Sequence, residues 1–378
     1  MNNAGKPDKR TKVALVGLGG YGETYMGLLQ RPEVRRACSL CGVVDPFAGR
    51  SAWHGHCREK GIPVYPSLDA FFRRDFAPLV ILSTPVFCHR DQVLTCFRHG
   101  AHALCEKPLC ATAEDAEALA EAADRAGLKL GVGFQWSFSD PIQALKRDIL
   151  AGRFGRPLRF KACVSWPRPT SYYKNSPWKG RIRTAAGDLV NDSIVTNAAA
   201  HYLHNLFFLN GGFAERFEAL TARAHAIETF DTCLIAGRMD NGCEFFFGAT
   251  HCGETTANPA FELTFEEGRA AYDADRGDAL TAERGREKLR YGALQGPGVT
   301  AQKITRMLEA VMQNGPVLCS ARDTLPHLQV CSALFSRLDV ARFPADACST
   351  VGDSVAVSGL WSRIRAAYET GRLPARLV

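Results

Sequence analysis

The sequence of 378 residues contains no apolar run of the length needed to cross a bilayer, which takes about 20 consecutive residues. Its polar start, MNNAGKPDKRTK, lacks the apolar segment of a secretory signal peptide. It also lacks a Lys/Arg-rich block with interleaved aromatic residues, the pattern typical of nucleic-acid binding, and its net charge of +7 is modest for its length. We therefore expect a cytoplasmic protein with no membrane or nucleic-acid partner.

The sequence also lacks a complete zinc-binding pattern, although it has 14 cysteines. Cys38 and Cys41 form one C-x-x-C pair without a second pair, and the group of His54, His56 and Cys57 has no partner cluster. The cysteines are scattered through expected strands and helices, so we interpret them as reduced and mostly buried side chains. We expect no bound metal.

The composition, 46% hydrophobic and 22% charged, is that of an ordinary globular protein without repeats or low-complexity tracts. The length suits two domains. A change of pattern after Gly133 predicts a first domain of residues 1–133 and a second of residues 134–378.

The first domain begins with an expected buried strand, residues 13–16, followed by a glycine-rich turn. Gly17, Gly19 and Gly22 have G-x-G-x-x-G spacing: the first permits a tight turn, the second lets a pyrophosphate approach the backbone, and the third lets helix and strand pack closely. The amino end of the following helix attracts that anion. We expect cofactor contacts from the turn residues Gly17, Gly19, Gly20, Tyr21 and Gly22.

A second apolar run, residues 40–44, ends in Asp45, about 20 residues beyond the turn, where a Rossmann fold places the carboxylate that accepts the ribose hydroxyls. A carboxylate there repels the 2′-phosphate of NADP, whereas Arg50 would compensate for it. The sequence thus favours NAD and does not exclude NADP. The structural alternative is that Asp45 caps the next turn before Pro46.

Expected strands at residues 78–83, 101–105 and 128–133 alternate with expected helices at residues 91–99 and 112–126. This alternation predicts an α/β Rossmann domain with a doubly wound parallel sheet, in which ligands bind outside the carboxyl ends of the strands. The residues that fall at this edge are Asp45, Thr84, Pro85, Glu106, Lys107 and Pro108.

Beyond Gly133 the pattern predicts an α+β domain with a large, mainly antiparallel sheet covered by helices on one face. The other face is open, and we expect a homodimer or homotetramer that buries it. Asp240-Asn241-Gly242 is a hairpin signal. The expected helices are residues 140–151, 324–338 and 353–371, and the expected strands are 158–166, 216–225, 229–239, 243–251, 260–266 and 269–274.

Lys107 stands between an acid and a proline directly after a buried strand. Pro108 favours an extended backbone at Lys107, so the ammonium can be aimed. A lysine in a partly desolvated cleft has a lowered pKa, which suits it to proton transfer or to binding a hydroxyl oxygen. The alternative is an ordinary solvated loop lysine.

In this order, the GLGGYG turn, Asp45, Ser83-Thr84-Pro85-x-x-x-His89 and HALCEKPL (residues 102–109) resemble the glucose–fructose oxidoreductase / inositol dehydrogenase / rhizopine catabolism (Gfo/Idh/MocA) family. GRFGRPLRF (residues 152–160) resembles the family's entry into its second domain. The resemblance implies NAD(P)-dependent oxidation of a sugar or polyol hydroxyl, or the reverse reduction, by dimers or tetramers formed through the sheets. It gives the E-K-P lysine, Lys107, the role of binding the reacting hydroxyl and assisting proton transfer. Further cofactor contacts are expected from Ser83, Thr84, Pro85, His89, Glu106, Lys107 and Gln135.

The family's second catalytic element is a D-x-x-x-H pattern with the histidine as general acid/base, and His201 matches that histidine. Asn197 stands where the family has Asp, and an amide cannot hold the negative charge that raises an imidazole pKa. Asp192 is near in sequence and is a candidate substitute. His204, on the same helix face, is expected to be structural, and a core role for His201 is the alternative.

The polar and aromatic loop of residues 171–186 suits a polyhydroxylated substrate, with packing of the loop on its own aromatics as the alternative. Its Trp178-Lys179 resembles a Trp-Arg or Trp-Lys of the family's substrate loop. Gln135 and Trp136 are expected to line the nicotinamide pocket. The expected substrate-binding residues are Lys107, Trp178, Lys179, Asp192, Asn197 and His201.

These observations favour a hydride-transfer enzyme with Lys107 and His201 as catalytic residues and a carbohydrate-like substrate. Two alternatives remain on the same scaffold. One is a glycosidase that oxidises its substrate transiently with tightly bound NAD. The other is a non-enzymatic dinucleotide sensor, which would be expected to lose the lysine–histidine pair.

Overall fold

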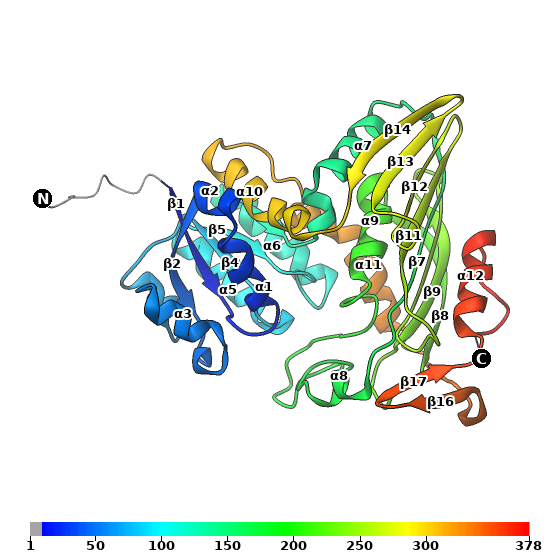
Figure 1. The fold of residues 1–378 in the computed structure, drawn as a ribbon, viewed down its shortest axis with the longest axis horizontal. Coiled ribbons are helices and arrows are strands. Elements are labelled where there is room, and N and C mark those ends of the chain that lie inside the picture. The colour runs from blue at the N-terminus through cyan, green and yellow to red at the C-terminus, as the bar shows by residue number, and fades with distance from the viewer. Residues whose placement is uncertain (1–9, 378) are drawn as a thin grey trace, which may run out of the picture. The chain divides into compact units, whose positions relative to one another are not determined.

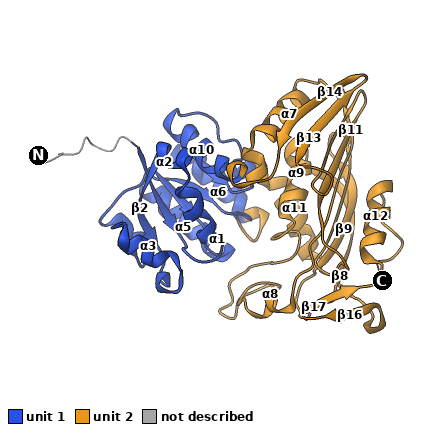
Figure 2. Cartoon of the chain, in the orientation of Figure 1, with its two compact units in different colours: residues 1–109, 115–134, 300–322 blue, residues 110–114, 135–299, 323–378 orange. Residues whose placement is uncertain are grey.

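The computed structural model describes residues 10–377, which divide into two compact units (Figures 1 and 2). Unit 1 consists of residues up to 109 together with 115–134 and 300–322, and unit 2 of residues 110–114, 135–299 and 323 onwards. The expected division after Gly133 lies beside one of these boundaries, but residues 300–322 group with unit 1. The polar start of the chain, for which we expect no signal peptide, lies mostly outside the described residues.

Unit 1 is built on a parallel sheet of six strands in the order β3-β2-β1-β4-β5-β6. Every residue of β4 and the last four residues of β1 are buried, as expected for central strands with both faces covered. The predicted doubly wound Rossmann fold is confirmed. The strands are β1 (Thr11–Val16), β2 (Cys38–Val44), β3 (Val64–Tyr65), β4 (Leu79–Leu82), β5 (His102–Cys105) and β6 (Leu130–Val132).

The helices of this region follow the strands in sequence, except for α10, which returns from far along the chain. They are α1 (Tyr21–Leu29), α2 (Pro32–Ala37), α3 (Trp53–Glu59), α4 (Leu68–Phe72), α5 (Val86–Arg98), α6 (Ala113–Ala126) and α10 (Pro297–Met312), with a 3-10 turn at Ala48–Arg50. Helix α5 begins five residues before the expected residue 91, directly after Pro85.

Unit 2 is built on a mixed, mostly antiparallel sheet of nine strands in the order β14-β13-β12-β11-β7-β10-β9-β8-β15, which confirms the second predicted fold class. Only the β7–β10 and β8–β15 pairs are parallel. The strands are β7 (Pro157–Ser165), β8 (Ala214–Arg223), β9 (Thr232–Met239), β10 (Glu244–Thr250), β11 (Ala257–Phe265), β12 (Arg269–Asp273), β13 (Ala279–Arg284), β14 (Glu287–Ala293) and β15 (Ala341–Arg342).

Helices pack on both faces of this sheet (Figure 1). Side chains alternate along β10: Phe245 and Phe247 face the core beneath α9 and α11, whereas Phe246 faces the other core, formed with α12. The helices are α7 (Asp140–Leu150), α8 (Thr170–Lys174), α9 (Ala200–Asn210), α11 (Ala321–Ser336) and α12 (Leu360–Thr370), with 3-10 turns at Gln135–Phe138 and Ala345–Ala347.

The C-terminal region differs from the prediction in two ways. The expected helix at residues 353–371 begins only at Leu360, because Ser354–Val357 forms strand β17 and pairs with β16 (Cys348–Val351) in a small separate sheet. Helix α12 then covers part of the sheet face that we expected to be open, with Leu360 and Ile364 fully buried.

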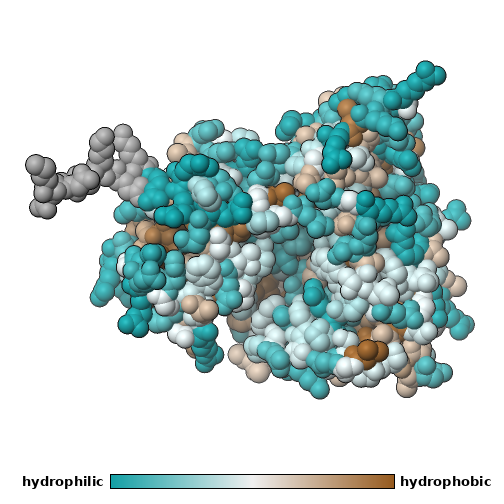
Figure 3. Space-filling view, viewed as in Figure 1, coloured by the Kyte–Doolittle hydropathy of each residue, from teal (hydrophilic) through white to brown (hydrophobic). Residues whose placement is uncertain are grey.

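The described surface is largely polar, and most of the cysteines are buried, as expected. In the view of Figure 3, hydrophilic and neutral side chains dominate the described surface, and strongly apolar ones form only small spots. Of the 14 cysteines, 11 are buried. Among residues 10–377, no helix combines the length and the apolar character required to cross a membrane.

Candidate functional site

The glycine-rich turn of unit 1 has the geometry expected of a phosphate cradle. A Cβ at Gly17 would lie 2.5 Å from the Ser83 carbonyl oxygen, and one at Gly22 would lie 2.1 Å from the Gly17 carbonyl oxygen, so both positions require glycine. A Cβ at Gly19 would meet nothing within 4 Å, and Gly19 is exposed ahead of the amino end of α1. The turn thus leaves backbone open where a pyrophosphate would bind.

The Asp45 carboxylate connects this turn to the end of β2. It accepts hydrogen bonds from the Leu18 amide at 2.7 Å and from the Phe47 amide at 2.7 Å. The second bond is the turn cap that we considered as the alternative, and the first fixes the glycine turn. The Arg50 guanidinium is exposed and stacks 4.8 Å from the Phe47 ring centre. A ribose contact by Asp45 stays a prediction.

Ser83, Thr84 and His89 lie at the next strand end, where β4 leads into α5. Among the described residues, the buried Ser83 Oγ has no hydrogen-bond partner, which leaves it available to a ligand at this edge. The Thr84 hydroxyl donates to Gln92 at 2.6 Å. The buried His89 ring lies 2.8 Å from the Thr84 carbonyl oxygen through Nε2 and 3.0 Å from the Pro108 carbonyl oxygen through Nδ1. It therefore holds the strand end after β4 against the segment after β5.

Glu106 anchors the segment that carries Lys107. Its Oε1 accepts hydrogen bonds from Lys303 Nζ at 2.6 Å and from the Tyr25 hydroxyl at 2.8 Å, and its Oε2 accepts from the Lys107 amide at 3.2 Å. Burial would raise the pKa of Glu106, but the Lys303 ammonium outweighs it and holds that pKa below its usual value. Glu106 is thus a buried, charged, hydrogen-bonded group, and Lys107 beside it is half-buried.

Lys303 of α10 is a site residue that no sequence motif predicted. Its side chain is completely buried, and its ammonium lies 4.5 Å from the ring centre of Tyr21 and 4.3 Å from that of Tyr25. It supports both the glycine-turn helix and Glu106. The chain separation of 197 residues between Lys303 and Glu106 explains why no local pattern indicated it.

In unit 2, the expected substrate residues of two segments lie together. The buried Asp192 carboxylate accepts from the Asn197 side-chain amide at 2.9 Å and from the Gly180 amide at 2.5 Å. The Lys179 ammonium lies 3.8 Å from the Tyr172 ring centre. Partial burial lowers the pKa of Lys179, and the Asp192 charge opposes this shift. Trp178, next to Lys179, is half-buried.

His201 is the second residue of α9 and is half-buried, whereas His204, one turn further along the helix, is buried. The His204 Nε2 lies 3.0 Å from the Ser137 hydroxyl. Burial holds the pKa of His204 well below its usual value, with the nearby His327 and His201 adding to the effect. A neutral, enclosed His204 fits a structural role.

The expectation that Trp136 lines the nicotinamide pocket is wrong. Its indole is buried in the core of unit 2, donates to the Leu294 carbonyl oxygen at 3.0 Å and packs edge-on against Tyr202 and Tyr272. Gln135 is half-buried and belongs to unit 2, so its expected cofactor contact remains untested.

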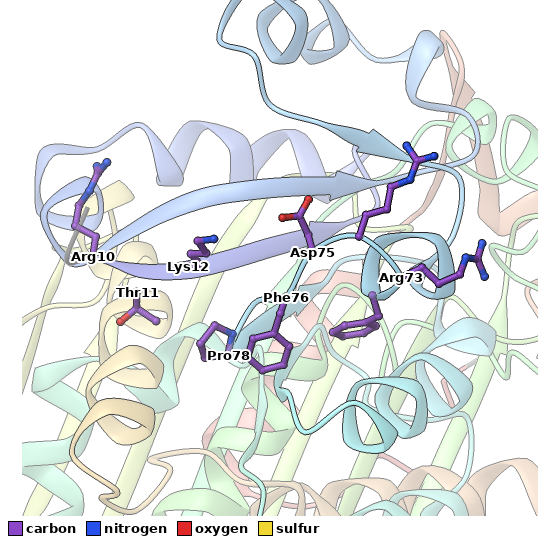
Figure 4. Close-up of a pocket in the computed structure, with 9 residues that line it drawn as sticks. Arg10, Thr11, Lys12, Arg73, Asp75, Phe76 and Pro78 are labelled. Atoms are coloured by element: carbon purple, nitrogen blue, oxygen red, sulfur yellow. The ribbon is translucent and has the colours of Figure 1, made fainter. Parts of the chain in front are cut away.

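A shallow cavity of about 690 Å³ lies elsewhere on unit 1 (Figure 4). It is found beside the amino ends of β1 and β4, whereas ligands of doubly wound sheets bind at the carboxyl ends. It contains no residue of the predicted site, so we do not assign the activity to it. It is lined by Arg10, Thr11, Lys12, Phe72, Arg73, Arg74, Asp75, Phe76 and Pro78.

The fold and the glycine turn define a protein with a nucleotide-binding Rossmann domain, and comparison with known families makes the class specific. Residues 11–134 match the family described as "Oxidoreductase family, NAD-binding Rossmann fold", and residues 142–271 match the "GFO/IDH/MocA C-terminal domain". The chain belongs to the Gfo/Idh/MocA family of oxidoreductases.

The individual relatives described here share about a quarter of their aligned residues with this chain. The chain is 26% identical over 210 residues to 2,7-anhydro-N-acetylneuraminate hydratase of Mediterraneibacter gnavus, covering 55% of this chain and 51% of that protein. It is 25% identical over 342 residues to D-apiose dehydrogenase of Paraburkholderia graminis, covering 86% of this chain and 87% of the relative. The chain thus spans about half the length of some curated relatives that it matches and most of the length of others.

Among solved structures, the WlbA dehydrogenase of Bordetella pertussis in complex with NADH and UDP-GlcNAcA has a TM-score of 0.71. It is 22% identical, and the match covers 87% of this chain and 96% of that one. This likeness supports the fold.

Proposed function

We propose that this protein is an NAD(P)-dependent dehydrogenase that transfers hydride between nicotinamide and a hydroxyl-bearing carbon of a sugar, polyol or sugar derivative. The observation that carries the proposal is the anchoring of Lys107 directly after β5. Glu106, Lys303 and His89 fix the chain on both sides of it, and a free loop lysine would need no such support. Family membership supports the choice of reaction, and the names of relatives such as D-apiose dehydrogenase support the substrate class.

The bound cofactor would supply the hydride acceptor, and Gly17, Gly19, Gly20, Tyr21 and Gly22 are proposed to hold it with Asp45, Ser83, Thr84, Pro85, His89, Glu106, Lys107 and Gln135. Asp45 favours NAD over NADP through its negative charge.

Lys107 is proposed to bind the oxygen of the reacting hydroxyl. An ammonium next to that oxygen stabilises the negative charge that develops as the proton leaves, and its three N–H donors fix the orientation of the carbinol. Glu106, which the Lys303 ammonium keeps ionised, is a positioning residue for Lys107.

His201 is proposed as the general acid/base, and Asp192 as the carboxylate that replaces the family aspartate. Asp192 lies at hydrogen-bond distance from Asn197, the residue that stands in the aspartate position, so a negative charge remains in this part of unit 2. Asn197, Trp178 and Lys179 are proposed to bind further substrate oxygens.

A turnover screen tests the proposal. Sugars, inositols and sugar acids would be offered with NAD and with NADP, and the expected result is lasting reduction of the cofactor with at least one of them. Lys107→Met should lower kcat by about 10²- to 10⁴-fold, the usual worth of general acid–base groups. Lys60→Met, at an exposed position of unit 1, is the matched control and should leave kcat unchanged.

Two results would contradict the proposed reaction. Product formation without net cofactor reduction would indicate transient oxidation, and full activity of Lys107→Met would remove the assigned role. Tight binding of dinucleotide without turnover of any substrate would indicate a sensor.

We further propose that the protein is cytoplasmic and forms a homodimer or homotetramer through the nine-stranded sheet. Light scattering coupled to size exclusion tests the assembly, and a monomer at micromolar concentration would contradict it. Helix α12 covers the face of β7 and β10, so the contact would use the strands on either side.

A further inference from the structure

Three metal-ligating side chains meet at one end of the nine-stranded sheet of unit 2, and the proposed reaction uses none of them. His225 follows β8, Asp231 precedes β9 and Cys252 follows β10. All three residues are buried, and one ligand atom from each lies within 4.8 Å of the others.

The distances in this cluster are close to those of a tetrahedral metal site. His225 Nδ1 lies 2.9 Å from Asp231 Oδ2 and 3.4 Å from Cys252 Sγ. Around zinc in tetrahedral geometry, with bonds of about 2.0–2.3 Å, neighbouring ligand atoms are separated by about 3.3–3.8 Å. The His225–Cys252 separation is already in this range, and the His225–Asp231 separation would have to widen by a few tenths of an ångström.

Each nitrogen of the His225 ring lies next to an oxygen atom. Its Nε2 lies 3.1 Å from the Arg168 carbonyl oxygen, and its Nδ1 faces the Asp231 carboxylate. A nitrogen, a carboxylate oxygen and a sulfur are thus gathered at one point, and these are the donor types that bind zinc in proteins.

The outer contacts are those that orient metal ligands. An N–H from imidazole to a backbone carbonyl fixes the tautomer that leaves the other nitrogen to the metal, and the Arg168 carbonyl is positioned for this. The Asp231 carboxylate also accepts from the backbone amides of Ala224 at 3.1 Å and His225 at 2.9 Å, which hold it in place.

We propose that His225, Asp231 and Cys252 bind a divalent zinc ion in a structural site. Cys348 of β16 is the proposed fourth ligand. It is half-buried, packs against the same hydrophobic cluster as Cys252, and pairs with Val357, whose amide donates to the Cys252 carbonyl oxygen at 2.8 Å. The ion would join the β8–β9 turn, the end of β10 and the β16–β17 hairpin.

The proposed zinc ligands are in contact with the start of the loop that we propose to bind the substrate. The ring of Tyr173 in α8 packs at a tilt against that of His225, with the ring centres 5.0 Å apart, and its hydroxyl lies 2.6 Å from Nδ1 of His251, next to Cys252 in sequence. The ion would fix α8 and thereby the start of the 171–186 loop.

The sequence led us to expect no metal because its local patterns lacked a complete ligand set. His225 and Asp231 are six residues apart, and Cys252 is 27 residues from His225. Only strand pairing brings the three together.

The test measures metal content on the full chain, expressed without a histidine tag. We expect one zinc per chain by elemental mass spectrometry after purification. After removal of zinc with a chelator, added Co²⁺ should give a thiolate-to-cobalt charge-transfer band, and added zinc should raise Tm. Cys252→Ala should lose the ion and the band. Cys233→Ala, which removes another buried thiol of this sheet, should retain both.

The measurement on the unmodified chain decides the question even if a variant fails to fold. Absence of stoichiometric zinc together with absence of the cobalt band in the chelated protein would overturn the proposal. Retention of the ion in Cys252→Ala, or its loss in Cys38→Ala instead, would also overturn it, since the ion would then lie elsewhere.

Discussion

Replacing Lys303 with methionine should destabilise unit 1 by removing the cation that balances Glu106. Methionine preserves much of the length and the apolar stem of lysine but deprives a carboxylate with 7% exposure of the ammonium that is hydrogen-bonded to it. The Tyr25 hydroxyl and the Lys107 amide would be its remaining hydrogen-bond donors among the bonds described above.

Breaking a buried ion pair by removing one partner costs about 3–5 kcal/mol, because the other charge stays desolvated. The exposed pair Lys60–Glu59, with the ammonium 2.9 Å from the carboxylate, provides the control. Lys60→Met should change stability by about 1 kcal/mol or less, because solvent screens exposed pairs. Lys303→Met with Glu106→Gln should recover much of the loss, since no buried charge remains.

The loss of stability in Lys303→Met should depend on pH in a defined direction. In the natural chain the pKa of Glu106 lies below its usual value, so its contribution to stability is present above the unfolded pKa and is lost as the pH falls. Without Lys303, burial raises that pKa, and stability is instead lost as the pH rises. The difference between the two proteins should therefore be small near about pH 4 and largest near neutrality.

The assay is hydrogen exchange of the α1 and α10 segments combined with calorimetric unfolding at several pH values. Faster exchange in both helices at pH 7, decreasing towards pH 4, is the expected result. A loss below about 1 kcal/mol at pH 7 would refute the reasoning, because it would place the pair in the class of exposed ion pairs.

Three further predictions concern separate features. Gly22→Ala should unfold unit 1, because its Cβ would overlap the Gly17 carbonyl oxygen, and normal folding of this variant would contradict that reasoning. Gly19→Ala should fold normally but bind NAD more weakly, as measured by titration calorimetry. Ile364→Ala should lower the free energy of unfolding by about 2–5 kcal/mol, measured with urea, as a fully buried aliphatic side chain; a negligible change would show that α12 does not hold the sheet face. Asp45→Ala should raise the ratio of NADP to NAD activity, and an unchanged ratio would show that its bonds to the turn are its whole role.

The sequence predicted the frame of unit 1 because its evidence is local. Residues 13–16 of β1 form a continuous apolar run, and the spacing of the glycines after them predicts a turn. The class of the sheet and the oxidoreductase family were therefore predicted, and both are confirmed. Helix α10 was not predicted, since Gly298 and Lys303 interrupt its apolar pattern. Strands β13 and β14 were missed because charged residues fill their exposed faces.

The candidate site likewise contains residues that local sequence motifs predict and residues that they do not. Lys107 and His201 were identified by local sequence motifs, whereas the side chains around them come in part from distant segments. Lys303 and the Asp192–Asn197 contact depend on side-chain positions that only the folded chain defines. The helix predicted from Asp353 failed at its start because Ser354–Val357 finds a strand partner, and pairing of that kind is not a local property.

The assignment of residues 300–322 to unit 1 has a consequence for how the protein is made. Ribosomes add about 5–20 residues per second, so about 10–40 s separate the synthesis of residue 134 from that of residue 322. During that interval the residues of all six strands of the parallel sheet have been synthesised, but Glu106 lacks the Lys303 ammonium. The core of the nascent nucleotide-binding domain is therefore complete only after strands β7 to β14 of the large sheet have been translated.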